Sequence, residues 1–135
     1  MSLRRKSREL ALQIIFQPEF NPQKSVSELL DFYKKNFEPS DEAYSYAEYI
    51  CNGVAHYKEE LDQKILESSE NWKLERMPLV DLSLLRIATF EILKNDELAS
   101  KISINESLEI AKKYSTDDSS KFINGLLDRI HNENQ

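Results

Sequence analysis

The chain has 135 residues and a formal net charge of −6; 31% of its side chains are charged and 40% are hydrophobic. This length and balance fit one folded domain and exclude a disordered chain and a membrane protein. Only two glycines are present, which argues against a Gly-rich phosphate-binding loop and against a β-rich fold, because tight turns in both depend on glycine. We therefore expect an all-α fold.

A first helix is predicted from about Leu3 to Gln17, where apolar residues recur with helical spacing. Pro18 and Pro22 bracket the loop that follows, since proline disrupts a continuing helix. Ser25 and Glu28 then have the spacing of a capping box, which predicts the start of a second helix. The apolar residues of this second helix are Val26, Leu29, Leu30, Tyr33 and Phe37.

A third helix is predicted after Pro39, with Ser40 or Asp41 as its N-cap. Asn52-Gly53 is either the C-terminal cap of this helix or a bend into the next one. The face expected to be buried consists of Ala43, Ala47, Ile50, Cys51 and Val54. A fourth helix follows from about His56 to Ser69.

Residues 70–77 are expected to form a connection anchored by Trp72. Pro78 fits the first turn of a fifth helix that runs to about Lys94. This helix is apolar on most sides, so we expect it to be the central one. Its charged Arg86 and Glu91 are interpreted as structural residues or as partner contacts.

Ser103 and Glu106 form a second capping-box pattern, which predicts the start of a sixth helix. The last helix is predicted to be capped by Thr116, Asp117 or Asp118. The sequence therefore indicates about seven helices. The residues of the last helix expected to face inward are Phe122, Ile123, Leu126, Leu127 and Ile130.

No arrangement of residues indicates catalysis, and we expect no enzyme, no cofactor and no metal. Neither His56 nor His131 follows a glutamate at the i, i+3 spacing of a helical metal site. Cys51 is the only cysteine, which excludes an intrachain disulfide and fits a reducing, cytoplasmic location. The N-terminus lacks the long apolar run of a signal peptide.

Charge is distributed unevenly along the chain. Residues 1–8 contain Arg4, Arg5, Lys6 and Arg8 and no acid, whereas the rest contains 14 basic and 24 acidic residues. On a helix Arg4 and Arg8 would lie one turn apart, with Arg5 beside them. Guanidinium groups so placed suit RNA phosphates, although a solvated basic terminus remains the alternative interpretation.

Three segments carry a resemblance to a known family: residues 4–13 (RRKSRELALQ), residues 72–93 with LRIA and FEIL, and residues 104–128 with INES and KFINGLLD. Their order and spacing resemble the NusB family of bacterial transcription antitermination factors. The resemblance covers nearly the whole chain, although residues 18–70 match only in helix pattern.

The resemblance implies an all-helical fold of two small subdomains packed together, with residues 1–135 acting as a single RNA-binding domain. It implies binding to the boxA RNA of nascent ribosomal RNA transcripts in the bacterial cytoplasm. It also implies NusE, a small-subunit ribosomal protein, as a partner within an RNA polymerase antitermination complex. The resemblance allows both a monomer and a homodimer.

The resemblance also implies roles for individual residues. The RNA contacts of the family map onto Arg4, Arg5, Lys6, Arg8, Asp118, Lys121 and Phe122. Its NusE contacts map onto Phe16 and Asp81, although many members have tyrosine at the position of Phe16. From the residues alone, Phe122 suits either a stacked base or the core, and Asp118 suits either a helix cap or an RNA contact. Gly125 within a helix suggests a close approach of another backbone or of RNA.

Two other functions fit the sequence. The first is a NusB-like accessory domain detached from an RNA methyltransferase, which the length of the chain opposes. The second is a helical protein–protein adaptor without an RNA role, in which the basic end is merely solvated.

Overall fold

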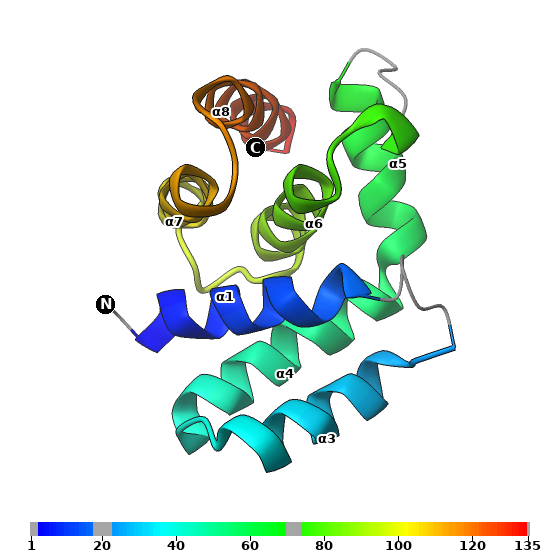
Figure 1. Cartoon of the computed structure of the whole chain (residues 1–135). Helices are drawn as coiled ribbons and strands as arrows, with labels where there is room; N and C mark the ends of the chain where they lie inside the picture. The colour runs from blue at the N-terminus through cyan, green and yellow to red at the C-terminus, as the bar shows by residue number, and fades with distance from the viewer. Residues whose placement is uncertain (1–2, 18–22, 70–73, 135) are drawn as a thin grey trace. The chain divides into compact units, whose positions relative to one another are not determined.

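The computed structural model describes residues 3–17, 23–69 and 74–134. Within these residues the chain forms seven α-helices and one short 3-10 helix, without strands (Figure 1). The all-α prediction is therefore confirmed. Two compact units divide the chain, Met1–His56 and Tyr57–Gln135, and each is described by itself.

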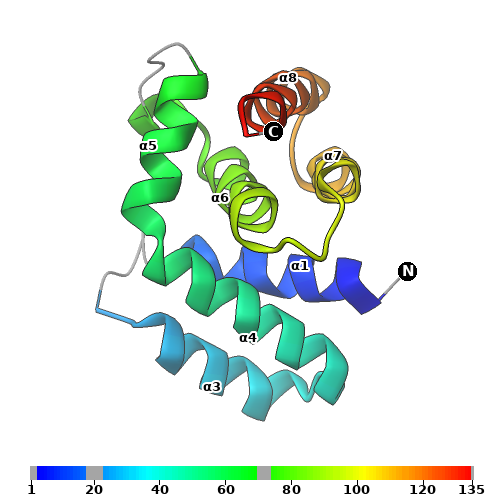
Figure 2. The same ribbon diagram turned by 180° about the vertical axis from the view of Figure 1, so that it is seen from behind.

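The first unit consists of α1 (Leu3–Ile15), α3 (Val26–Phe37) and α4 (Asp41–His56). α4 lies between α1 and α3, as both views show (Figures 1 and 2). The predicted apolar face of α4 is buried, and fully buried Ala11, Ile14, Ala47 and Ile50 fill the space between α1 and α4. The Ser7 hydroxyl lies 2.9 Å from the carbonyl oxygens of both Leu3 and Ala43, which ties the start of α1 to α4.

Side-chain caps set the helix starts in the first unit. The Ser25 hydroxyl accepts a 3.1 Å hydrogen bond from the Glu28 amide, which confirms Ser25 as the N-cap of α3 and gives the first half of the predicted capping box. The Ser40 hydroxyl accepts from the Ala43 amide at 3.3 Å, which makes Ser40 the capping side chain of α4. α4 continues through Gly53 to His56, so Gly53 does not end it.

The second unit consists of α5 (Lys58–Ser68), the 3-10 helix η1 (Leu74–Arg76), α6 (Leu79–Lys94), α7 (Ser100–Tyr114) and α8 (Asp117–Glu133). α6 packs against α5, α7 and α8 (Figures 1 and 2). Every residue from Asp81 to Ile92 is buried, which confirms α6 as the central helix of its unit. Pro78 is its N-cap, one position before the predicted first turn.

Polar contacts join α5 to its neighbours. Arg86 of α6 pairs bidentately with Asp62 of α5, with Nε–Oδ1 and Nη2–Oδ2 distances of 2.8 and 3.0 Å. This pair supports the structural interpretation of Arg86. At the C-terminal end of α5, an Arg129 guanidinium N–H donates to the Ser68 carbonyl at 2.7 Å.

The second predicted capping box is wrong. α7 begins at Ser100 with Ala99 as its N-cap, so Ser103 and Glu106 lie inside the helix. Ser103 is fully buried, because its helical position faces the core. The S-x-x-E pattern also occurs within helices, where it has no capping role.

The last helix also corrects details of the prediction. Thr116 is the N-cap of α8, with its hydroxyl accepting from the Ser119 amide at 3.1 Å, so Asp118 is not the cap.

Phe122 is 37% exposed and does not belong to the inward face of α8. A Cβ built on Gly125 would meet no described atom of the chain within 4 Å, so no close approach of another backbone in the described residues explains this glycine. A close approach of RNA at Gly125 stays a prediction. Trp72 lies outside the described residues.

Candidate nucleic-acid interface

The basic residues of α1 divide into surface and core. Arg4 and Lys6 are exposed and Arg5 is partly exposed. Arg8 is only 1% exposed, and its guanidinium carbon lies 5.6 Å from the centre of the Tyr46 ring. The expectation that Arg8 contacts RNA does not fit this burial, because Arg8 lies on the side of α1 that packs against α4. Three of the four basic side chains are thus at least partly exposed.

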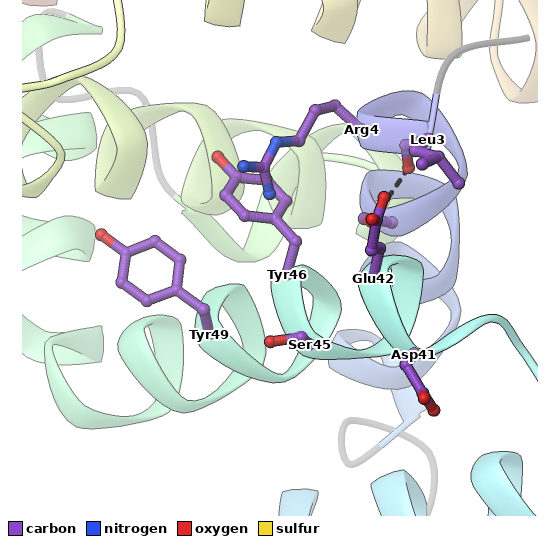
Figure 3. A pocket seen from close by; sticks show the side chains of 8 residues that line it. Leu3, Arg4, Asp41, Glu42, Ser45, Tyr46 and Tyr49 are labelled. Carbon is purple, nitrogen blue, oxygen red and sulfur yellow. Dashed lines mark hydrogen bonds between the residues drawn. The ribbon is translucent and has the colours of Figure 1, made fainter.

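Arg4 is held in place by an aromatic ring. Its guanidinium carbon lies 3.8 Å from the centre of the Tyr46 ring, so the two planes stack (Figure 3). Tyr46 is 8% exposed, and Tyr49 lies beside it with ring centres 5.7 Å apart. Stacking restrains a long side chain that would otherwise lose rotamer freedom on binding. Arg4 is therefore preorganised at the start of α1.

The start of α8 presents the second group of predicted RNA contacts. Asp118, Lys121 and Phe122 all lie in the first two turns and are all exposed. A helix N-terminus carries N–H groups without helical partners and a partial positive charge, which suits a phosphate. Asp118 opposes such a ligand by its own charge. Phe122 offers a ring face at this helix end.

The two predicted protein contacts differ in accessibility. Phe16, just after α1, is partly exposed. Asp81 is 2% exposed, and its Oδ1 accepts a 2.8 Å hydrogen bond from the Ser115 hydroxyl. The expectation that Asp81 contacts NusE directly does not fit this burial. Its carboxylate lies at the packed junction between α6 and the end of α7.

The single cysteine and the possible metal-binding side chains were the remaining candidates for a reactive site. Burial raises the pKa of the Cys51 thiol to about 12, so the thiol is protonated and unreactive near neutral pH. Among residues 3–17, 23–69 and 74–134, no group of three or more His, Cys, Asp or Glu side chains is placed to hold a metal. In the same residues no helix is long and apolar enough to span a bilayer.

The sequence did not indicate three residues that hold other side chains in position. Tyr46 stacks on Arg4, Ser115 binds Asp81, and Asp62 pairs with Arg86. Each partner is distant in sequence from the residue it contacts. The only available signal was the tyrosine-rich character of 44–49, which marks one helix without indicating what it faces.

Solved structures show the same fold. A NusB structure from T. maritima superposes with a TM-score of 0.89 at 33% identity, covering 96% of this chain and 91% of that one. A chain from a complex of antitermination factors NusB and NusE with double-stranded RNA gives a TM-score of 0.88 at 21% identity, covering 98% of each chain. The second likeness is one of fold.

Sequence relatives extend the likeness to function. A transcription antitermination protein NusB of Bdellovibrio bacteriovorus is 47% identical over 131 residues, covering 96% of each chain. One of Clostridium novyi is 41% identical over 126 residues, covering 92% of this chain and 94% of the relative. The NusB family profile matches residues 5–132.

The helical fold and these matches define a transcription antitermination protein, which is not an enzyme. The chain belongs to the NusB family. The match covers nearly the whole length of relatives that are antitermination proteins, which favours this function over that of a methyltransferase accessory domain.

Proposed function

We propose that this chain binds boxA-type single-stranded RNA of nascent ribosomal RNA transcripts together with NusE. It does so within an RNA polymerase antitermination complex of the bacterial cytoplasm, and residues 1–135 act as one RNA-binding domain. The observation that carries the proposal is the exposure of Arg4 and Lys6, with Arg5 partly exposed, on a chain whose remainder is strongly acidic.

Electrostatics favours α1 as the place where RNA is held. Residues 1–8 contain four basic side chains and no acid, whereas acids outnumber bases by 24 to 14 in the rest. Long-range repulsion from the acidic remainder opposes RNA, so binding depends on a local positive surface. Arg4 contributes most to it, because its guanidinium is fixed on Tyr46 and its in-plane N–H groups suit a phosphate.

The start of α8 adds the recognition of an unpaired base. Phe122 is exposed beside Lys121 at a helix N-terminus. An aromatic face stacks on any unpaired base, and the neighbouring cation and helix N–H groups bind its phosphate. Single-stranded RNA, whose bases are free to stack, is therefore a better ligand than a duplex.

Cooperation with NusE explains how a small basic surface on an acidic protein suffices. A solved complex of other antitermination factors contains NusB and NusE together with double-stranded RNA. A partner that also touches the RNA raises affinity through effective concentration. Phe16 is the accessible residue of the two expected NusE contacts, and Asp81 would act through the structure around it.

A gel-shift titration with boxA RNA, with and without NusE, tests the proposal. We expect weak binding by this chain alone and markedly tighter binding once NusE is added. A scrambled RNA of equal length serves as the control for sequence-independent charge effects. NusE binding without any RNA binding would identify the chain as an adaptor and refute the proposal.

A further inference from the structure

A pocket of about 650 Å³ lies between the start of α1 and the first turns of α4, within the first unit. Its volume falls within the roughly 300–1,000 Å³ of small-ligand sites. The residues that carry the following argument are Arg4, Glu42, Ser45, Tyr46 and Tyr49 (Figure 3). None of these except Arg4 is assigned a role by the family resemblance.

The Arg4–Tyr46 stack forms one side of this pocket. Stacking uses the face of the guanidinium, at 3.8 Å from the ring centre, and leaves its in-plane N–H groups directed outward. Within the described part of the chain, no hydrogen bond or ion pair engages these N–H groups. The Arg4 guanidinium is thus held in position in this pocket, with N–H groups that can donate hydrogen bonds to an anionic group.

The carboxylates of Asp41 and Glu42 lie on another side of this pocket. Glu42 extends toward α1 in Figure 3, whereas neighbouring Asp41 points away from Arg4. Both belong to the first turn of α4, and both are exposed. A bare phosphate would be repelled by these acids, because two negative charges outweigh that of Arg4. The ligand must therefore supply hydrogen-bond donors as well as an anion.

Tyr49 supplies an accessible aromatic surface. Its side chain is 43% exposed, whereas the adjacent Tyr46 is covered. An unpaired base that stacks on such a ring presents its Watson–Crick edge to neighbouring polar groups. Guanine is the one RNA base with two adjacent donors on this edge, N1–H and N2–H, which a single carboxylate accepts together.

We propose that this pocket binds one unstacked guanosine of single-stranded RNA. Arg4 binds the phosphate of this guanosine and Tyr49 stacks on the base. The Glu42 carboxylate accepts hydrogen bonds from N1–H and N2–H on the Watson–Crick edge of the base. The inference rests on the proposed function, since RNA is the ligand, and it adds a base preference at α1. Adenine, cytosine and uracil each place an acceptor beside the donor and would leave the carboxylate facing a lone pair.

The test uses short oligouridylates with one central guanosine, inosine or adenosine, titrated against the full chain by fluorescence anisotropy. We expect guanosine to bind roughly five- to tenfold more tightly than adenosine, the low end of what a bidentate contact discriminates. Inosine lacks the N2 amino group and should fall between them. Glu42→Gln should abolish the preference without weakening adenosine binding, because the variant loses only the carboxylate.

Matched variants distinguish the loss of the guanosine preference from the effect of removing one negative charge. Glu48→Gln removes the same charge from an exposed site on α4 outside the pocket and should keep the preference. Tyr49→Ala should weaken binding of the guanosine oligonucleotide, whereas Tyr49→Phe keeps the ring and should retain this binding. The melting temperature of each variant verifies that it is folded. A guanosine preference that is absent, or that survives Glu42→Gln, overturns the inference while leaving RNA binding intact. If no RNA binds at all, the proposed function fails as well; if Glu42→Gln weakens only NusE binding, the pocket belongs to the protein partner.

Discussion

The Ser115 hydroxyl donates a 2.8 Å hydrogen bond to the buried Asp81 carboxylate, joining the end of α7 to the first turn of α6. Ser115 is the C-cap of α7, and the next residue, Thr116, is the N-cap of α8. Asp81 therefore fixes the turn from which Lys121 and Phe122 follow. Asp81, which the family resemblance places at the NusE contact, thus supports the start of α8, the helix that we propose binds RNA.

Replacing Asp81 by alanine should destabilise the chain by about 1–3 kcal/mol, because the Ser115 hydroxyl loses its buried partner. Ser115→Ala should weaken RNA and NusE binding in the same direction if Asp81 acts only by positioning. Urea unfolding and titration with each partner measure these effects. If Asp81→Ala abolishes NusE binding while Ser115→Ala leaves it unchanged, Asp81 contacts NusE directly.

The salt dependence of RNA binding tests the basic surface of α1. Each phosphate neutralised on a single strand contributes roughly −0.7 to the slope of log K against log salt. If Arg4 and Arg5 each meet one phosphate, replacing both by alanine should flatten the slope by about 1.4. A double alanine variant of Lys34 and Lys35, which are exposed on α3, removes the same charge and should leave the slope nearly unchanged.

Arg8 should behave differently from its neighbours. Because it is buried against α4, Arg8→Ala should cost about 1–3 kcal/mol of stability through lost packing and stacking. The salt slope of the folded variant should be that of the wild type. A flattened slope without a change in melting temperature would place the Arg8 guanidinium on RNA after all.

Phe122 and Ile123 offer a comparison between adjacent residues. Phe122 is 37% exposed and Ile123 is fully buried. Phe122→Ala should weaken RNA binding by about 1–3 kcal/mol, the usual contribution of one stacked base, and should leave stability almost unchanged. Ile123→Ala should instead cost about 2–5 kcal/mol of stability. If Phe122→Ala lowers the melting temperature and spares RNA binding, Phe122 has a packing role only.

The sequence predicts the helices well wherever local chemistry decides them. The apolar character of residues 79–93 identifies the central helix of the second unit, and the caps at Ser25 and Thr116 lie among the predicted ones. Local chemistry fails at Ser103, because a serine three residues before a glutamate also fits the interior of a helix. There, packing against the core determines the conformation.

The candidate interface is less accessible to sequence reasoning. A run of basic residues predicts a positive helix, but only packing against α4 distinguishes exposed Arg4 from buried Arg8. The same holds for Asp81, whose burial depends on Ser115 in another helix. Helical spacing gives the angle of each side chain around its own helix and leaves undetermined which angle faces a neighbour.

The pair of Arg86 and Asp62 should be a large contributor to stability in the second unit. The side chains are 6% and 21% exposed, and Asp62→Ala would leave a largely buried guanidinium without its bidentate partner. We expect a loss of roughly 3 kcal/mol. Lys112→Ala removes one partner of the exposed pair with Glu109 and should change stability by less than about 0.5 kcal/mol. Equal effects of the two substitutions in urea unfolding would contradict this assignment.

Cys51 should make stability depend on alkaline pH. Burial raises the pKa of its thiol from an ordinary 9.0 to about 12, with a smaller contribution from Glu48. Between these values the unfolded chain loses the thiol proton and the folded chain keeps it. Rising pH therefore favours the unfolded state, and stability that is fully present below the unfolded pKa is lost as pH increases.

The comparison of wild type with Cys51→Ala isolates this effect, because the lysine titrations and nearly all tyrosine titrations are common to both proteins. Cys51 makes only the smallest of the contributions that raise the pKa of Tyr44. From about pH 8 to about pH 10, the wild type should lose about 1 kcal/mol more stability than the variant in urea unfolding. The native thiol should also resist alkylation until the chain is unfolded, since Cys51 is fully buried. Equal losses in the two proteins, or rapid alkylation of the folded chain, would show that the thiol ionises without unfolding.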